Sequence, residues 1–137
     1  MAHHYNPTVV GITVALHLTW ATGLFFEPSA INATALHTML ILTGDPFLSA
    51  LIFGMVAILA MLGILTNPLA DRILLILPQH LVLWVSTVGV FYAMYMGQFA
   101  DGVPRSHWFL IVDQIPVVLL AFGHTVALIL MARGHHG

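Results

Sequence analysis

The sequence from Trp108 to Met131 is a run of 24 residues that is apolar almost throughout. At ~1.5 Å per residue, a helix of this length reaches ~36 Å and can cross a hydrocarbon core of ~30 Å with some tilt. The three residues inside it that interrupt this character are Asp113, Gln114 and His124. The run therefore predicts a transmembrane helix over residues 108–132, closed by Arg133.

Three earlier runs carry the same pattern and predict spans over residues 8–26, 47–65 and 73–97. Glu27 and Pro28 end the first run, because charge and proline stop a helix. Asp45 can cap the second, and Pro46 suits its first helical position. Pro78 lies early in the third run, so two alternatives remain there. Either one helix is kinked at Pro78, or a short interfacial helix precedes a span that begins at Pro78.

The first connection holds an apolar segment, Ala33 to Leu42, that is too short to cross a bilayer. It predicts an interfacial or re-entrant segment with His37 at the level of the lipid headgroups. The expected fold is all-α: a polytopic membrane protein with four transmembrane helices in an antiparallel bundle and this short segment in the first loop. No linker-like stretch divides the chain, so residues 1–137 are predicted to form one transmembrane domain.

Composition supports the membrane assignment, since 60% of the residues are hydrophobic and 6% are charged. Soluble domains have roughly 45–50% apolar and about 25% charged residues. The lipid bilayer is therefore the expected surrounding of the chain. Three arginines and no lysine leave no basic patch for phosphates, which excludes nucleic acid as a partner. The absence of cysteine excludes disulfides, thiolate chemistry, thioether-attached haem and all-cysteine iron–sulfur clusters.

The arginines also predict an orientation. Four spans place both termini on one side together with Arg72 and Arg133, whereas Arg105 falls on the other side. Positive residues are enriched in cytoplasmic segments. Cytoplasmic N- and C-termini are therefore predicted.

Three histidines fall inside predicted spans at a similar depth. His17, His80 and His124 each lie ~10 to 14 Å from the same membrane face at 1.5 Å per residue. Imidazoles from separate helices can ligate haem iron, zinc or copper, and a pair such as His17 and His124 suits b-type haem. Two alternatives are neutral histidines that hydrogen-bond a facing group and help the helices pack, and a proton relay that includes Asp113.

Asp113 lies within ~20° of His124 on one helical face, because eleven positions at ~100° make about three turns. An ionisable side chain facing lipid costs several kcal/mol, so this face is expected to turn inward or toward a partner. Pro116 leaves the carbonyl of Val112 without its helical partner, beside Asp113 and Gln114. We therefore take Asp113 and Gln114 as candidate residues for contact with a proton or a partner chain.

The chain contains no hydrolase elbow, phosphate-binding loop, dinucleotide fingerprint or paired carboxylates, so a non-enzymatic role is favoured. The expected function is that of an integral membrane subunit in a homo-oligomer or a larger membrane complex, with haem b or a His-ligated metal as the candidate cofactor. Gly54, Gly63 and Gly89 would permit close contact between helices.

The size of the chain and its four spans with short connections resemble the broad class of small phage or bacterial membrane proteins that includes holins. This resemblance implies an alternative function, an oligomer that permeabilises membranes. It covers the spans and no particular motif. The chain also departs from the class, because the Lys/Arg-rich cytoplasmic tail common in holins is missing.

Overall fold

The computed structural model describes residues 6–28, 34–96 and 107–134, and these contain helices and no strand. The helices are α1 (Thr8–Phe26), α2 (Thr34–Thr43), α3 (Pro46–Leu65), α4 (Leu69–Met96) and α5 (His107–Gly134). Four segments are long and apolar enough to cross a membrane: Thr8–Phe26, Pro46–Leu65, Leu69–Tyr92 and Ile115–Gly134. The protein is thus an all-α integral membrane protein built on a four-helix bundle, as the sequence predicts.

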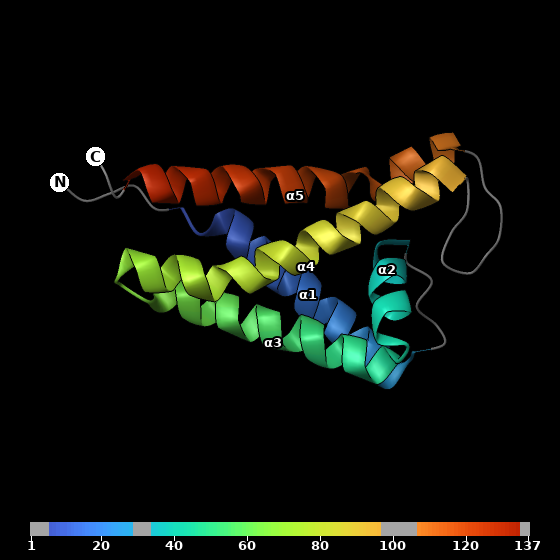
Figure 1. Cartoon of the computed structure of the whole chain (residues 1–137), viewed down its shortest axis with the longest axis horizontal. Coiled ribbons are helices and arrows are strands. Elements are labelled where there is room, and N and C mark those ends of the chain that lie inside the picture. The colour runs from blue at the N-terminus through green and yellow to red at the C-terminus, as the bar shows by residue number, and fades with distance from the viewer. Residues whose placement is uncertain (1–5, 29–33, 97–106, 135–137) are drawn as a thin grey trace.

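The long helices alternate in direction, and α1 begins at the end of the bundle where α5 finishes (Figure 1). Helix α3 packs against both α1 and α4, and α5 packs mainly against α4. The short helix α2 lies at the opposite end, near α3 and α4, and at 10 residues it is too short to span. Because α1 and α4 run in the same direction, residues at corresponding depths of these two helices share a level.

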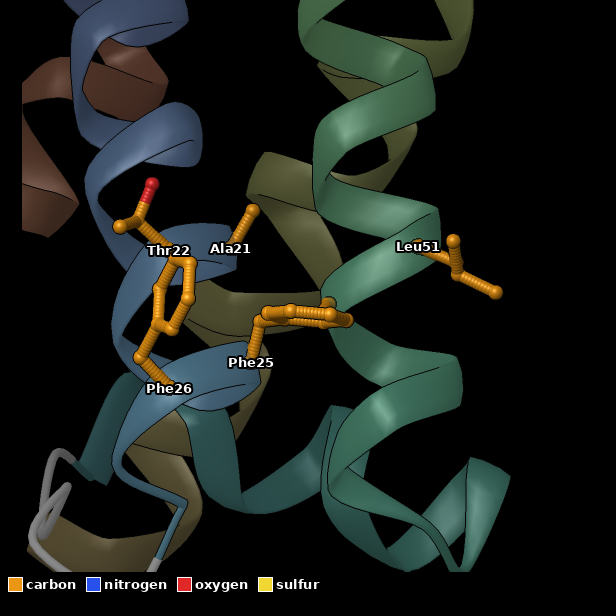
Figure 2. Close-up of a pocket in the computed structure, with 6 residues that line it drawn as sticks. Ala21, Thr22, Phe25, Phe26 and Leu51 are labelled. Atoms are coloured by element: carbon orange, nitrogen blue, oxygen red, sulfur yellow. The ribbon is translucent and has the colours of Figure 1, made fainter.

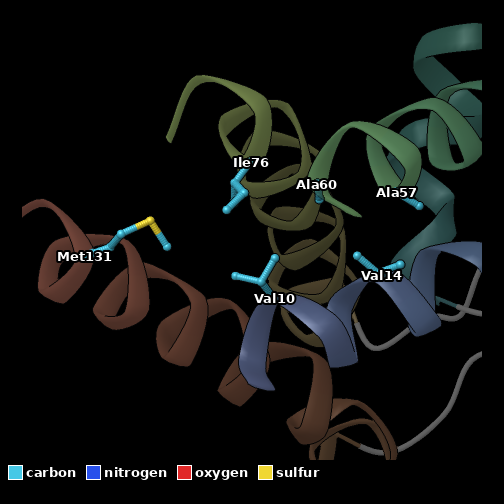
Figure 3. Packing of buried hydrophobic residues seen from close by; sticks show 6 residues of the cluster. All are labelled: Val10, Val14, Ala57, Ala60, Ile76 and Met131. Atoms are coloured by element: carbon cyan, nitrogen blue, oxygen red, sulfur yellow. The ribbon is translucent and has the colours of Figure 1, made fainter. Parts of the chain in front are cut away.

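Two clusters of buried apolar side chains hold the bundle together. The first joins all four long helices and is shown in Figure 3: Val10, Val14, Ala57, Ala60, Ile76 and Met131. The second joins α1, α2 and α3 nearer the other end: Leu24, Leu36, Met39, Ala50 and Phe53. Val82 and Val85 of α4 pack against this second cluster, as does Trp20 of α1. The α1 and α4 segments between the clusters therefore lie at one level, and they contain His17 and His80.

Local chemistry sets the start of α3. The Asp45 side chain accepts a hydrogen bond from the backbone N–H of Phe47 at 3.0 Å, and Pro46 occupies the first turn. Gly44, just before the cap, has a φ of +69°, a conformation that residues with a Cβ rarely adopt. The Thr43 and Ser49 hydroxyls lie 2.6 Å apart across this corner. Together these contacts turn the chain from α2 into α3.

Helix α4 is continuous from Leu69 to Met96 with Pro78 inside it, so the structure follows the single-helix alternative. It begins before the predicted start at Ile73. Proline removes one N–H from the helical ladder, which neighbouring helices and tertiary packing can offset in a membrane protein. Here Ile76 and Gln79, on either side of Pro78, are both fully buried.

The turn between α3 and α4 brings the two helices into close contact at Gly63. A Cβ placed on Gly63 would lie 2.8 Å from Cγ1 of Ile76 and 3.1 Å from the carbonyl oxygen of Arg72. The Arg72 Nε also donates a hydrogen bond to the carbonyl of Thr66 at 2.9 Å. Only a residue without a side chain fits this crossing without displacing α4.

Candidate functional site

The contact between α4 and α5 contains a chain of three polar side chains. Nδ1 of His80 lies 3.0 Å from Nδ1 of His124, and Nε2 of His124 lies 2.8 Å from Oε1 of Gln79. The two imidazole rings are nearly parallel, with an interplanar angle of 22°, and their centroids are 5.1 Å apart. Because the nitrogens are much closer than the centroids, the rings meet through their Nδ1 edges. His124 therefore uses both ring nitrogens inside the protein.

Trp84 extends this polar contact by one turn of α4. Its indole N–H donates to the Thr125 hydroxyl at 3.0 Å, and that hydroxyl donates to the carbonyl of Ala121 at 3.0 Å. The Trp84 ring lies edge-on to Phe122 and to His80, with centroid distances of 5.3 Å and 6.3 Å. The α4–α5 contact is thus specified by hydrogen bonds and ring packing over two helical turns.

His17 lies in a different environment, although it shares the level of the other histidines. It is fully buried, and its ring packs 5.8 Å from that of Trp20 and 5.4 Å from that of Phe53. Neither ring nitrogen has a hydrogen-bond partner among the described residues, and the same is true of Gln79 Nε2. An unpaired buried polar group costs about 1–3 kcal/mol, so these atoms require an explanation.

A facing threonine does not supply that partner. Thr13 lies one turn before His17 and is fully buried, but its hydroxyl donates to the carbonyl of Val9 in its own helix at 2.9 Å. Thr87 of α4 likewise bonds the carbonyl of Leu83 at 2.9 Å. Both hydroxyls donate to carbonyls of their own helices, and the imidazole of His17 has no hydrogen-bond partner within the described part of the chain.

The structure places the predicted site residues as follows. It brings His80 and His124 into direct contact, and it puts His17 on the neighbouring helix without a hydrogen bond to either. Asp113 and Gln114 belong to α5, but their side chains lie outside the described part of the structure. The side chain of His37, on α2, is also outside it.

Gln79 is the site residue that sequence reasoning missed. It is an amide within an apolar run and adjacent to His80, which is a visible signal. It is not among the site residues predicted from the sequence. Gln79 is nevertheless fully buried, whereas His80 is only half-buried.

Among the described residues, no group of three or more His, Cys, Asp or Glu side chains is arranged to hold a metal ion. A surface pocket lies elsewhere, between α1 and α3, and is shown in Figure 2. Its lining is Ala21, Thr22, Phe25, Phe26, Ala50 and Leu51. This lining is apolar apart from Thr22, whose hydroxyl donates to the Leu18 carbonyl of its own helix. The pocket therefore suits lipid chains better than a charged ligand.

Comparison with protein-family models, with curated proteins and with solved structures finds no match to this chain. The site is therefore interpreted from its own geometry.

Proposed function

We propose that this protein is a non-enzymatic subunit of a membrane complex, built from further copies of the chain or from other membrane proteins. The observation that carries the proposal is the polar chain Gln79–His124–His80 between two membrane-spanning helices. Ionisable residues inside a membrane are costly, and they are retained mainly where they bind or conduct something. No nucleophile paired with a base accompanies these side chains in the described residues, so binding is favoured over catalysis.

The cofactor that we propose for His17, His80 and His124 is haem b or a His-ligated metal ion. Neutral imidazole nitrogens are common ligands of haem iron, zinc and copper. His17 presents two ring nitrogens without a hydrogen bond to described residues, and His80 presents its Nε2. A free ion bound here would need further ligands from water, a partner chain or residues outside the described part.

Absorption spectroscopy and metal analysis of the protein purified from membranes test this cofactor. A haem site is expected to give a Soret band and a sharp reduced α-band, and a zinc or copper site to give near-stoichiometric metal without a Soret band. Thr125→Val is a matched control, because it removes a hydrogen bond from the same helix contact and leaves every imidazole in place. If the purified protein contains neither haem nor metal, the proposed cofactor is rejected, whereas the proposed role as a subunit is unaffected.

The partner contact is proposed to involve α5. Only 17% of the residues in its best spanning segment are buried in the bundle, compared with 44% for α4. Asp113 and Gln114 lie on this helix, near its N-terminal end, and are proposed as the residues that meet a proton or a polar group of a partner. An inward or partner-facing position would spare Asp113 from contact with lipid.

The orientation that we propose has both termini in the cytoplasm. Arg72 and Arg133 lie at the end of the bundle where α1 begins and α5 finishes, which concentrates positive charge on that side. Reporter fusions at Asn67 and after Arg133 are expected to report a cytoplasmic location. A periplasmic or extracellular signal from both sites would invert the proposed topology.

A holin-like pore is the competing function. It predicts collapse of the membrane potential when the chain alone is expressed, whereas a complex subunit is expected to leave the potential unchanged. Leakage that Asp113→Leu abolishes and His17→Leu preserves would favour the pore.

A further inference from the structure

The pocket between α1 and α3 lies at the end of the bundle where α1 finishes and α3 begins (Figure 2). It encloses about 320 Å³ and opens toward the surface of the bundle. Its lining on α1 runs from Ala21 to Phe26, so at ~1.5 Å per residue it lies within ~8 Å of the end of that span. In a hydrocarbon core of ~30 Å this is the outer third, next to the lipid headgroups of one leaflet.

Small side chains at the helix contact make this surface concave. Ala21 and Ala50 form the base of the pocket, and a Cβ placed on Gly54 would lie only 3.9 Å from the Cβ of Ala21. The rings of Phe25 and Phe26 stand beside this base, and more than half of each is exposed. Pockets for small ligands have volumes of about 300–1,000 Å³, so this one has room for part of a hydrocarbon chain and leaves a headgroup outside.

Two carboxylates stand near the mouth of the pocket. Glu27 directly follows Phe26, the last residue of α1. Asp45 accepts a hydrogen bond from the backbone N–H of Phe47 at 3.0 Å, and the Phe47 ring lies 5.9 Å from the ring of Phe25. Both carboxylates are exposed, and neither forms an ion pair with a described residue. They are therefore available to a charged group outside the protein.

The charge of the described side chains at this end of the bundle is negative. Arg72 and Arg133 lie at the opposite end, together with Asp71. The sequence places Arg105 just before α5, and within the described structure α5 packs mainly against α4 and does not contact α3. A lipid headgroup at the mouth of the pocket therefore meets carboxylates, which attract an ammonium group and repel a headgroup of net negative charge.

We propose that this pocket binds one phospholipid, with an acyl chain between α1 and α3 and a primary ammonium headgroup beside Glu27 and Asp45. A primary ammonium group has three N–H donors for carboxylate oxygens, whereas a trimethylated ammonium group has none. Phosphatidylethanolamine therefore fits the site better than phosphatidylcholine, and better than the anionic phosphatidylglycerol. The lipid site is separate from the histidines and does not depend on the proposed function.

The headgroup is tested by titrating the delipidated protein, in mild detergent, with the three phospholipids carrying the same fluorescent acyl chain. Phosphatidylethanolamine is expected to bind most tightly, and its preference over phosphatidylglycerol should fall as salt is added. Glu27→Gln and Asp45→Asn should each lower this preference by about 2–5-fold, the range for exposed charge pairs. Asp45→Asn keeps an acceptor for the Phe47 N–H. Asp71→Asn, at the opposite end, is the control and should leave the preference unchanged.

The position of the acyl chain is tested by a matched pair of substitutions on α1. Thr22 and Thr19 are both exposed, and their hydroxyls donate at 2.8 Å to the carbonyls of Leu18 and Ala15 in their own helix. Thr22 lines the pocket and Thr19 does not. Thr22→Phe is expected to fill the pocket and abolish saturable binding of phosphatidylethanolamine, whereas Thr19→Phe should leave it unchanged.

Two results would overturn the proposal. If phosphatidylethanolamine binds no better than phosphatidylglycerol, or if Glu27→Gln and Asp45→Asn leave the preference unchanged, the headgroup is not recognised by these carboxylates. If Thr22→Phe weakens binding no more than Thr19→Phe, the lipid lies on another surface. Neither result bears on haem, metal or partner binding, so the proposed function is judged separately.

Discussion

His17 and His124 are both fully buried histidines at one level of the bundle, yet they differ in the hydrogen bonds that their ring nitrogens form. His124 forms hydrogen bonds through both nitrogens, and His17 forms none with the described residues. Removal of a hydrogen-bonded partner leaves another buried group unsatisfied, whereas removal of an unpaired group leaves nothing behind. The two histidines should therefore respond differently to the same substitution.

His124→Leu is expected to lower the free energy of unfolding of the metal-free protein by about 1–3 kcal/mol, because Gln79 and His80 lose their partner. His17→Leu should change it by less than about 1 kcal/mol or raise it, since leucine suits the apolar surroundings of Trp20 and Phe53. Equilibrium unfolding in mixed micelles measures both. A larger loss from His17→Leu than from His124→Leu would show that His17 has a bound partner in the membrane.

Sequence reasoning located the histidines at the residue scale but not their partners. Depth follows from counting along a helix, so the common level of His17, His80 and His124 could be anticipated from span boundaries. Hydrogen-bond choice depends on rotamers and on helix rotation, which counting does not give. Thr13 illustrates this, because its hydroxyl, one turn from His17, donates to the carbonyl of Val9 in its own helix and not to the imidazole.

At the scale of helices, the α3–α4 crossing depends on Gly63. Gly63→Ala is expected to lower the free energy of unfolding by about 1–3 kcal/mol. The added Cβ would lie only 2.8 Å from Cγ1 of Ile76 and 3.1 Å from the carbonyl oxygen of Arg72, so α4 would have to shift. Gly54→Ala in the same helix is the matched control. Its Cβ would meet only the Cβ of Ala21, at 3.9 Å, so it should be neutral or stabilising by up to ~1 kcal/mol. Equal effects of the two substitutions would contradict the close crossing.

The start of α3 gives a second prediction at this scale. Asp45→Ala removes the side-chain acceptor for the Phe47 N–H and should cost about 0.5–2 kcal/mol of stability. Asp45→Asn keeps an acceptor oxygen and should cost much less. Thermal unfolding of the three proteins, followed by circular dichroism, compares them. Similar melting temperatures for Asp45→Ala and the unaltered protein would show that the cap contributes little.

Helix boundaries were predictable where local chemistry decides them. Asp45 and Pro46 predict the start of α3 from the sequence itself, and Glu27 and Pro28 predict the end of α1. The continuity of α4 through Pro78 was not decidable in this way. Proline breaks a helix unless packing on both sides offsets the lost hydrogen bond, and the burial of Ile76 and Gln79 depends on the other helices.

For the whole molecule, the exposed surface of α5 leads to a prediction about association. The chain in nanodiscs or mild detergent is expected to form species larger than a monomer, and Asp113→Leu should change their distribution more than Leu119→Ala. Leu119 is an exposed residue of the same helix and provides the control. Light scattering coupled to size-exclusion chromatography measures the mass. A single monomeric species that Asp113→Leu does not alter would contradict the proposed role of α5.

The four-helix bundle was predictable from the apolar runs alone, because their length and number leave few other arrangements in a bilayer. Which helices pack against one another, and through which residues, was not predictable from these runs. Contacts such as His80 with His124 depend on tilt and rotation of α4 and α5, which are set by packing against the remaining helices.

The close α3–α4 crossing also bears on how the chain enters a membrane. Only Thr66, Asn67 and Pro68 separate the two helices, and the contact at Gly63 begins at once after the turn. Helices joined so tightly cannot be threaded through a translocon at widely separate times, because the second starts to pack before the first has diffused away. The pair is therefore suited to leave the translocation channel as one preassembled hairpin.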